Sequence, residues 1–432
     1  MQALLSFEQA PPITAPLRFF LTAPLFGMLA GLLLLVEGPE LFASRWSTSA
    51  LAITHLLTLG FLLQIMLGAL IQILPVVAGA NLKNPSLLSS LVHFSLSAGA
   101  LSLAAGFLSG AKAALHAGAG LLTFCIVLFL WAAVAALRGV PSSSPTIRGI
   151  KLALLGLFGV ASLGVFLVFA LQQGTNFSLI ALTDLHAGWG LAAWSGVLLI
   201  AVAYVVVPMF QLTPGYPARP GWWFPVGIFG LLVLWTLAVW FNLEILIRCT
   251  KAVLALCGIA FCVLTLRLQA QRRRAKSDAT SRYWKLGLLS SILALLMMLT
   301  AAIWPELGEK DAWSIGFAIL LLVGGFFSFM IGMLYKIVPF LAWLHLQNQG
   351  KGQIAAPTMN KLLSDAAMQG QFHAHRWGIA FLLLATIFPE WGARVAGLGM
   401  ILSMLWLGFN LLSVVRRYRA FARDISVRLL QP

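Results

Sequence analysis

The chain has 432 residues, of which 60% are hydrophobic and 9% are charged. This composition places it among polytopic membrane proteins. The net charge of +16 does not indicate a nucleic-acid partner, because the basic residues lie in short loops between apolar runs, where they set membrane topology. The four cysteines have no C-x-x-C spacing, so the sequence predicts neither a disulfide framework nor a zinc site.

Twelve apolar runs follow one another along the chain. Backbone polar groups cannot face lipid unpaired, so each run predicts a membrane-spanning helix in an all-α bundle. The eighth and eleventh runs are short for a span of about 20 residues. The runs lie near residues 16–36, 51–75, 87–108, 113–137, 150–171, 181–209, 222–242, 251–266, 284–304, 313–343, 374–389 and 393–415.

The distribution of charge gives the bundle a direction. The loop after the eighth run and the C-terminal tail are rich in arginine, whereas the loop after the ninth run contains Glu306, Glu309 and Asp311. Basic loops stay in the cytoplasm, so we expect both termini on the cytoplasmic side of a bacterial inner membrane. Arg248 and Lys251 fall on the outer side and do not fit this rule.

Three of the predicted helices share one layout, which suggests an internal repeat. The second, sixth and tenth runs contain glycines and close on Pro75, Pro208 and Pro339, with spacings of 208 − 75 = 133 and 339 − 208 = 131 residues. This period predicts three pseudo-symmetric four-helix units, near residues 1–140, 141–275 and 276–432. Chance remains the alternative, since apolar helices often contain glycine and end near proline.

Histidines are the main candidates for chemistry, because ionisable side chains in a membrane are costly and neutral imidazole binds haem iron and copper. His55 and His186 open the second and sixth helices at the outer side, at matching places in the repeat. Both are predicted cofactor and metal ligands. His116 also falls on the outer side, outside the repeated motif, and is a further candidate for binding the cofactor. The alternative for each is a ring at headgroup depth that bonds water.

Other polar side chains fit structural roles. His373 and His375 point apart on a helix and lie beside Arg376, so we expect both at the inner interface. Gln64 and Gln72 are expected to bond neighbouring helices. Asp184 either orients an imidazole or is an exposed loop charge. Because no soluble-enzyme signature is present, the sequence does not decide whether the protein is an enzyme.

The layout of twelve spans, three four-helix units and outer-side histidines on helices 2 and 6 resembles subunit I of the haem–copper oxidases. In that family helix 2 supplies an axial ligand to a low-spin haem, which corresponds to His55. Helix 6 supplies a ligand to the active-site metal, which corresponds to His186. The resemblance therefore implies haem and copper as cofactors, and respiratory-chain or cytochrome partners in the lipid bilayer.

The chain departs from that family at its oxygen-reducing centre. The seventh run has no histidine pair, and the outer half of the tenth, WSIGFAILLLVGG, has no H-x-H. The segments PLRFF and PVVAG look more like the NnrS-type membrane proteins, which bind haem and copper and protect against nitric oxide stress. The resemblance thus implies a haem-binding membrane protein without the full oxygen-reduction site, acting in the nitric oxide response or in respiratory metal and haem handling.

Two other functions stay open. The bundle is alternatively a transporter of a metal, haem or small solute, or a cofactor-free assembly protein. The presence of a Soret band in the purified protein would favour the haem protein over both.

Overall fold

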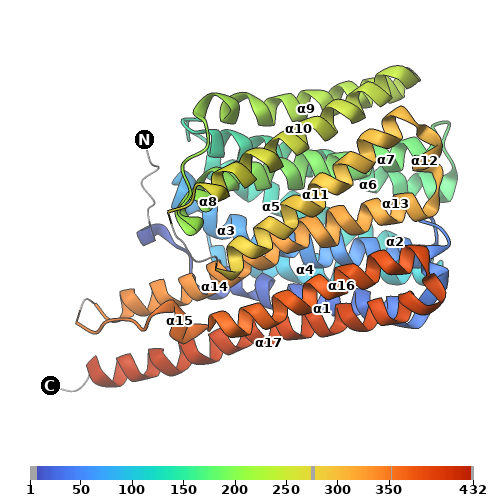
Figure 1. Cartoon of the computed structure of the whole chain (residues 1–432). Coiled ribbons are helices and arrows are strands. Elements are labelled where there is room, and N and C mark those ends of the chain that lie inside the picture. The colour runs from blue at the N-terminus through green and yellow to red at the C-terminus, as the bar shows by residue number, and fades with distance from the viewer. Residues whose placement is uncertain (1–6, 274–277, 352, 430–432) are drawn as a thin grey trace.

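The structure is a computed structural model that describes residues 7–273, 278–351 and 353–429. Within these ranges the chain is helical and has no β-strand. The helices run along one another in a single elongated bundle, and both chain ends lie at the same end of it (Figure 1). The all-α membrane bundle predicted from the sequence is therefore confirmed at this level.

The helices of the first half are η1 (Phe7–Gln9), α1 (Thr14–Glu37), η2 (Gly38–Phe42), α2 (Thr48–His55), η3 (Leu56–Leu63), α3 (Gln64–Ala78), α4 (Pro85–Ser109), α5 (Lys112–Leu137), α6 (Pro145–Gln173), α7 (Leu179–Gly188), η4 (Trp189–Gly196) and α8 (Val197–Gln211). Those of the second half are α9 (Ala218–Trp240), α10 (Glu244–Ala270), α11 (Ala279–Ile303), α12 (Pro305–Glu309), α13 (Asp311–Ala318), η5 (Ile319–Phe327), α14 (Ser328–Gln349), α15 (Met359–Leu362), α16 (Asp365–Ile387) and α17 (Pro389–Leu429).

Local sequence explains where several helices begin. The side chains of Ser47, Ser144, Ser178, Asp278 and Ser364 each accept a backbone N–H from the first turn that follows. Such N-caps satisfy donors that a helix start otherwise leaves unpaired. Prolines at the first position of α4, α6, α12 and α17 add a preset backbone angle where no N–H is needed.

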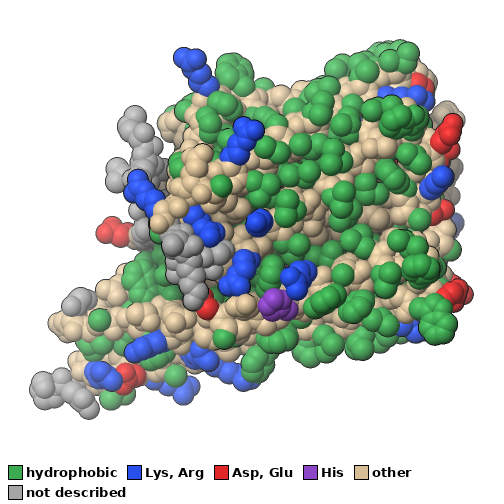
Figure 2. Space-filling model, in the orientation of Figure 1, with side chains coloured by type: hydrophobic (Ala, Val, Ile, Leu, Met, Phe, Trp, Pro, Cys, Tyr) green, Lys and Arg blue, Asp and Glu red, His purple; other side chains and the backbone are tan. Residues whose placement is uncertain are grey.

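Eleven helices of the described chain are long and apolar enough to cross a membrane. Large apolar side chains such as Phe94, Trp131 and Phe409 are 63–70% exposed on the outside of the bundle. Figure 2 shows that such side chains cover the middle of the visible face, while charged groups gather toward its two ends. This exposed apolar surface indicates a protein in contact with the lipid bilayer.

The twelfth expected span, α16, is 23 residues long but is not among those eleven helices. It begins at Asp365, nine residues before the predicted start at 374. The predicted start was too late because the first turns contain polar residues, which a search for apolar runs leaves out. It packs along α17 over its length (Figure 1). The count of twelve spans therefore stays a prediction.

Three composite helices form the centre of the bundle: α2–η3–α3, α7–η4–α8 and α13–η5–α14. Between 56% and 83% of the residues in their most apolar windows are buried, against at most 50% in the other eight. They pack against α1, α6 and α11 respectively. The outer helices close a ring, because α5 contacts α6, α10 contacts α11 and α17 contacts α1. The boundaries of the three predicted units stay a prediction.

Each central helix contains a π-helical segment at the same distance from its proline. The segments η3, η4 and η5 end twelve residues before it, as 75 − 63, 208 − 196 and 339 − 327 show. The expectation that these stretches close on proline is wrong, since α3, α8 and α14 all continue beyond it. Neighbouring helices in a membrane bundle can satisfy the backbone groups that a proline frees, so an internal proline is tolerated there.

A repeated hydrogen bond accompanies two of these prolines. The hydroxyl of Thr146 on α6 donates to the carbonyl oxygen of Ala201, and that of Thr280 on α11 donates to the carbonyl oxygen of Gly332, at 2.9 and 3.0 Å. Ala201 and Gly332 each stand seven residues before their proline. The prediction that Gln64 and Gln72 bond neighbouring helices is confirmed for Gln64, whose amide donates to Ser97 on α4 at 2.8 Å. It is not confirmed for Gln72, whose amide oxygen is buried and has no partner among the described residues.

Candidate cofactor site on two central helices

His55 is the last residue of α2, directly before η3. Its Nδ1 lies 2.8 Å from the carbonyl oxygen of Leu51, one turn earlier in the same helix. A carbonyl oxygen can only accept, so Nδ1 carries the proton and Nε2 of the neutral ring keeps its lone pair. The half-buried ring also lies against Phe107 of α4, with 5.1 Å between the ring centroids. His55 is therefore held with its metal-binding nitrogen free.

His186 reaches the same state through a different contact. It lies in α7, three residues before η4, and its Nδ1 is 3.1 Å from the carbonyl oxygen of Val160 on α6. Nδ1 is again the donor and Nε2 the free acceptor. Gly164 makes room for the ring, since a Cβ there would lie 3.0 Å from its Cε1. This N–H to carbonyl bond is the usual way in which proteins orient a ligating histidine.

The two predicted ligands face one another. The ring centroids of His55 and His186 are 6.4 Å apart, and the rings are inclined by 25°. Two metal–nitrogen bonds of about 2.0–2.1 Å put ligand nitrogens on opposite sides of one metal about 4 Å apart. If both Nε2 atoms point to one ion, the ring centroids lie further apart than the nitrogens, and the observed separation is compatible with that arrangement.

Asp184 anchors the outer side of this pair. Its two carboxylate oxygens contact Arg45 Nη1 at 3.3 Å and Lys251 Nζ at 2.8 Å, which ties together the segment before α2, helix α7 and helix α10. The backbone N–H of Arg45 also donates to Asp311 at the start of α13. Within the described residues Asp184 thus pairs with these two cations and makes no hydrogen bond to an imidazole. The ion pair also gives Lys251 a partner at the end of the bundle that the charge rule would assign to neither lysine nor arginine.

His116 is not part of this arrangement. It is an exposed residue of α5, and its nearest aromatic ring is that of Phe169 on α6, with 5.9 Å between centroids. The structure therefore does not bring the third predicted cofactor residue to the pair. His93 bonds Thr22 through Nε2 at 2.8 Å, and His345 bonds the carbonyl of Leu341 in its own helix.

His375 does not lie at the interface, so that prediction is wrong. It is 2% exposed inside α16, and its Nε2 is 3.0 Å from the hydroxyl of Ser328, the first residue after η5. His373 is exposed, as expected for a side chain that points the other way. The polar residues of α16 could have indicated the buried position of His375 from the sequence. A histidine buried in a membrane bundle needs a hydrogen-bond partner, and a helix with other polar residues can take part in such bonds.

Further buried polar groups surround His375 and join α16 to its neighbours. Tyr283 of α11 donates a short hydrogen bond to Gln371, and the Gln371 amide donates to the Ser403 hydroxyl on α17 at 3.1 Å. Asn410 of α17 donates to the Tyr335 hydroxyl at 2.9 Å. All of these side chains are at most 3% exposed. The network satisfies polar groups that would otherwise be unpaired within the bundle.

The donor set can be compared with what a bare ion and a haem each require. Among the described residues no group of three or more His, Cys, Asp or Glu side chains is placed to hold a metal ion. A bare zinc ion usually takes at least three protein ligands. A haem iron needs only axial ligands from the protein, and histidine is a common one. Two imidazoles with free Nε2 atoms therefore fit a haem better than a zinc ion.

Comparison with known proteins identified no relative of this chain among protein-family models or curated proteins. The site must therefore be interpreted from its own geometry.

Proposed function

We propose that this integral membrane protein binds one haem between His55 and His186, with the two imidazoles as axial ligands. The observation that supports this most is the facing pair of rings, 6.4 Å apart, each with Nδ1 engaged by a backbone carbonyl. A bound haem would supply one-electron redox chemistry. The chain's part is to fix the tautomer and orientation of both imidazoles and to shield the site within the outer ends of α2, α4, α6 and α7.

The paired ligands favour one of the roles that the family resemblance implies. His55 and His186 would both be used to hold the haem, and neither would remain to bind a gas beside it. Electron transfer or haem handling in a respiratory chain is therefore favoured over direct binding of nitric oxide or oxygen at this site. Copper is the second metal that imidazole nitrogens suit, and it would occupy the same pair.

The remaining parts of the proposal concern the membrane. We place α16 as a twelfth span, the membrane as a bacterial inner membrane and both termini in the cytoplasm. The histidine pair then lies toward the outer face, where a cytochrome or another respiratory partner would dock. Transport of an ion or charged solute is less favoured, because the space between α3, α8 and α14 is lined by apolar residues.

The test is haem content per protein in purified full-length variants. His55→Ala and His186→Ala each remove one axial ligand and should lose most of the haem. His373→Ala is the matched control, since its ring is exposed and should not matter. His375→Ala would be a poor control, because that side chain is buried and bonded. A wild-type preparation without haem, or full haem in both outer variants, would exclude the proposal.

A further inference from the structure

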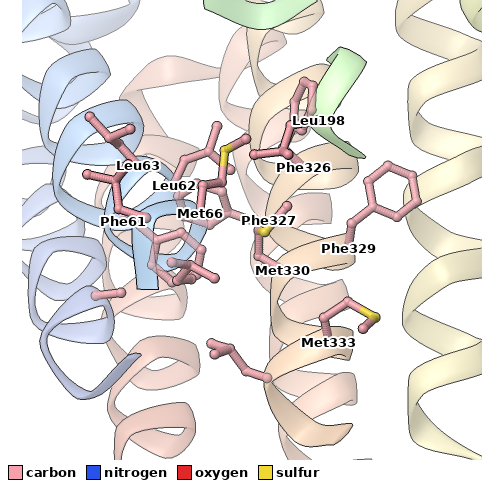
Figure 3. Packing of buried hydrophobic residues seen from close by; sticks show 14 of the residues in the cluster. Phe61, Leu62, Leu63, Met66, Leu198, Phe326, Phe327, Phe329, Met330 and Met333 are labelled. Atoms are coloured by element: carbon pink, nitrogen blue, oxygen red, sulfur yellow. The ribbon is translucent and has the colours of Figure 1, made fainter. Parts of the chain in front are cut away.

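A second feature of the bundle is a cavity of about 50 Å³ between α3, α8 and α14, on the side of the π segments toward the prolines. Figure 3 shows Met66 of α3, Leu198 of α8 and Met330 of α14, which all line it. The helices α3, α8 and α14 each pack outward on the first long helix of their own group, α1, α6 and α11 respectively, and the cavity lies between them.

The cavity is lined by equivalent positions of the three central helices. The five lining residues of α3 stand 10, 9, 6, 5 and 2 residues before Pro75. The five of α8 stand 10, 9, 6, 5 and 2 residues before Pro208, and the four of α14 stand 9, 6, 5 and 2 before Pro339. The three helices thus present the same face to one central space. This recurrence marks the cavity as part of the repeated architecture rather than a local packing gap.

The lining excludes water. All fifteen lining residues have apolar or aromatic side chains. Trp284 is the one lining residue with a polar side-chain atom, and its indole N–H does not open onto the cavity, whose exposed wall is entirely apolar. A buried water usually makes about three hydrogen bonds, so this wall cannot satisfy one. The cavity is also larger than the roughly 10–15 Å³ that one water needs and smaller than the roughly 150 Å³ cavity known to take benzene.

We infer that this central cavity is a dry binding site for an apolar molecule of one or two heavy atoms, the class to which the diatomic gases belong. The apolar wall supplies dispersion contacts to a guest of this kind and asks for no hydrogen bond in return. The site is separate from the histidine pair and does not depend on haem binding.

Xenon is the probe for this inference, since it is apolar and can be located in crystals. Crystals of the full chain pressurised with xenon should show one strong peak between α3, α8 and α14. Ala69→Leu adds three carbon atoms to the wall, six residues before Pro75, and should abolish the peak. Ala105→Leu adds the same atoms on the exposed face of α4 and should leave it unchanged.

Met330→Ala is a second variant that tests the inference even if Ala69→Leu does not fold. It removes atoms from the cavity wall instead of adding them. It should enlarge the cavity and raise xenon occupancy. The inference is overturned by an absent peak in the wild type, by ordered water in the cavity, by a peak that survives Ala69→Leu, or by occupancy that Met330→Ala leaves unchanged.

Discussion

At the scale of single residues, the position of a hydrogen-bond partner decides what each histidine can do. His55 and His186 donate Nδ1–H to backbone carbonyls, and their Nε2 atoms have no partner in the described part of the chain, whereas Nε2 of His375 lies 3.0 Å from the hydroxyl of Ser328. The outer histidines could be singled out from the sequence because they recur near the starts of related helices. The carbonyl of Val160, 26 residues before His186, could not, because it depends on how α6 packs beside α7.

The buried network around Gln371 should be sensitive to a single hydroxyl. Tyr283→Phe removes the donor to Gln371 and leaves its amide oxygen unpaired in the bundle. An unpaired buried acceptor costs about 1–3 kcal/mol, so the thermal unfolding temperature in detergent should fall. Tyr418→Phe is the control, because the Tyr418 hydroxyl has no hydrogen-bond partner in the described part of the chain and the residue is only half-buried. Equal stability of the two variants would contradict this account of the network.

At the scale of helices, the sequence predicted the positions of the spans well and their internal geometry poorly. Eleven of the twelve apolar runs coincide with helices that are long and apolar enough to span a membrane, because hydropathy determines this directly. The π segments, the continuation of α3 past Pro75 and the early start of α16 were not predicted. Each depends on packing against neighbouring helices, which hydropathy does not measure.

Close packing at the first π segment gives a testable consequence. A Cβ on Gly60 would lie 2.1 Å from Cδ1 and 2.6 Å from Cβ of Phe26, a buried residue of α1 that cannot move aside freely. Overpacking of this kind typically costs about 1–3 kcal/mol, so Gly60→Ala should lower the thermal unfolding temperature.

Gly120→Ala provides the comparison for that measurement. Gly120 lies within the exposed part of α5, and a Cβ there would meet no atom within 4 Å. This variant should be neutral or slightly more stable, because alanine favours helix over glycine. If both alanines have the same effect, the close contact between η3 and α1 is not as described.

At the scale of the whole molecule, charge separates the two ends of the bundle. Figure 2 shows acidic side chains at the end opposite the chain termini. Eight of the twelve acidic residues belong to segments at that end: Glu37, Glu40, Asp184, Glu244, Glu306, Glu309, Asp311 and Glu390. Because Lys and Arg are retained in the cytoplasm, the end that carries the termini should be the cytoplasmic one.

Cysteine labelling tests this orientation. In a background with Cys249→Ser, which removes the exposed native thiol, Arg273→Cys should react only with reagent on the cytoplasmic side. Glu309→Cys should react only from the outer side. The reverse pattern would move the histidine pair to the cytoplasmic half of the membrane.

The central claim is that two imidazoles hold one haem, and the most direct measurement is the electron paramagnetic resonance spectrum of the oxidised full-length protein. Two histidine ligands predict a six-coordinate, low-spin ferric signal. Removal of either ring, in His55→Ala or His186→Ala, should abolish that signal through loss of haem or conversion to a high-spin form. A wild-type spectrum without ferric haem, or a low-spin signal that persists unchanged in both variants, would contradict the account.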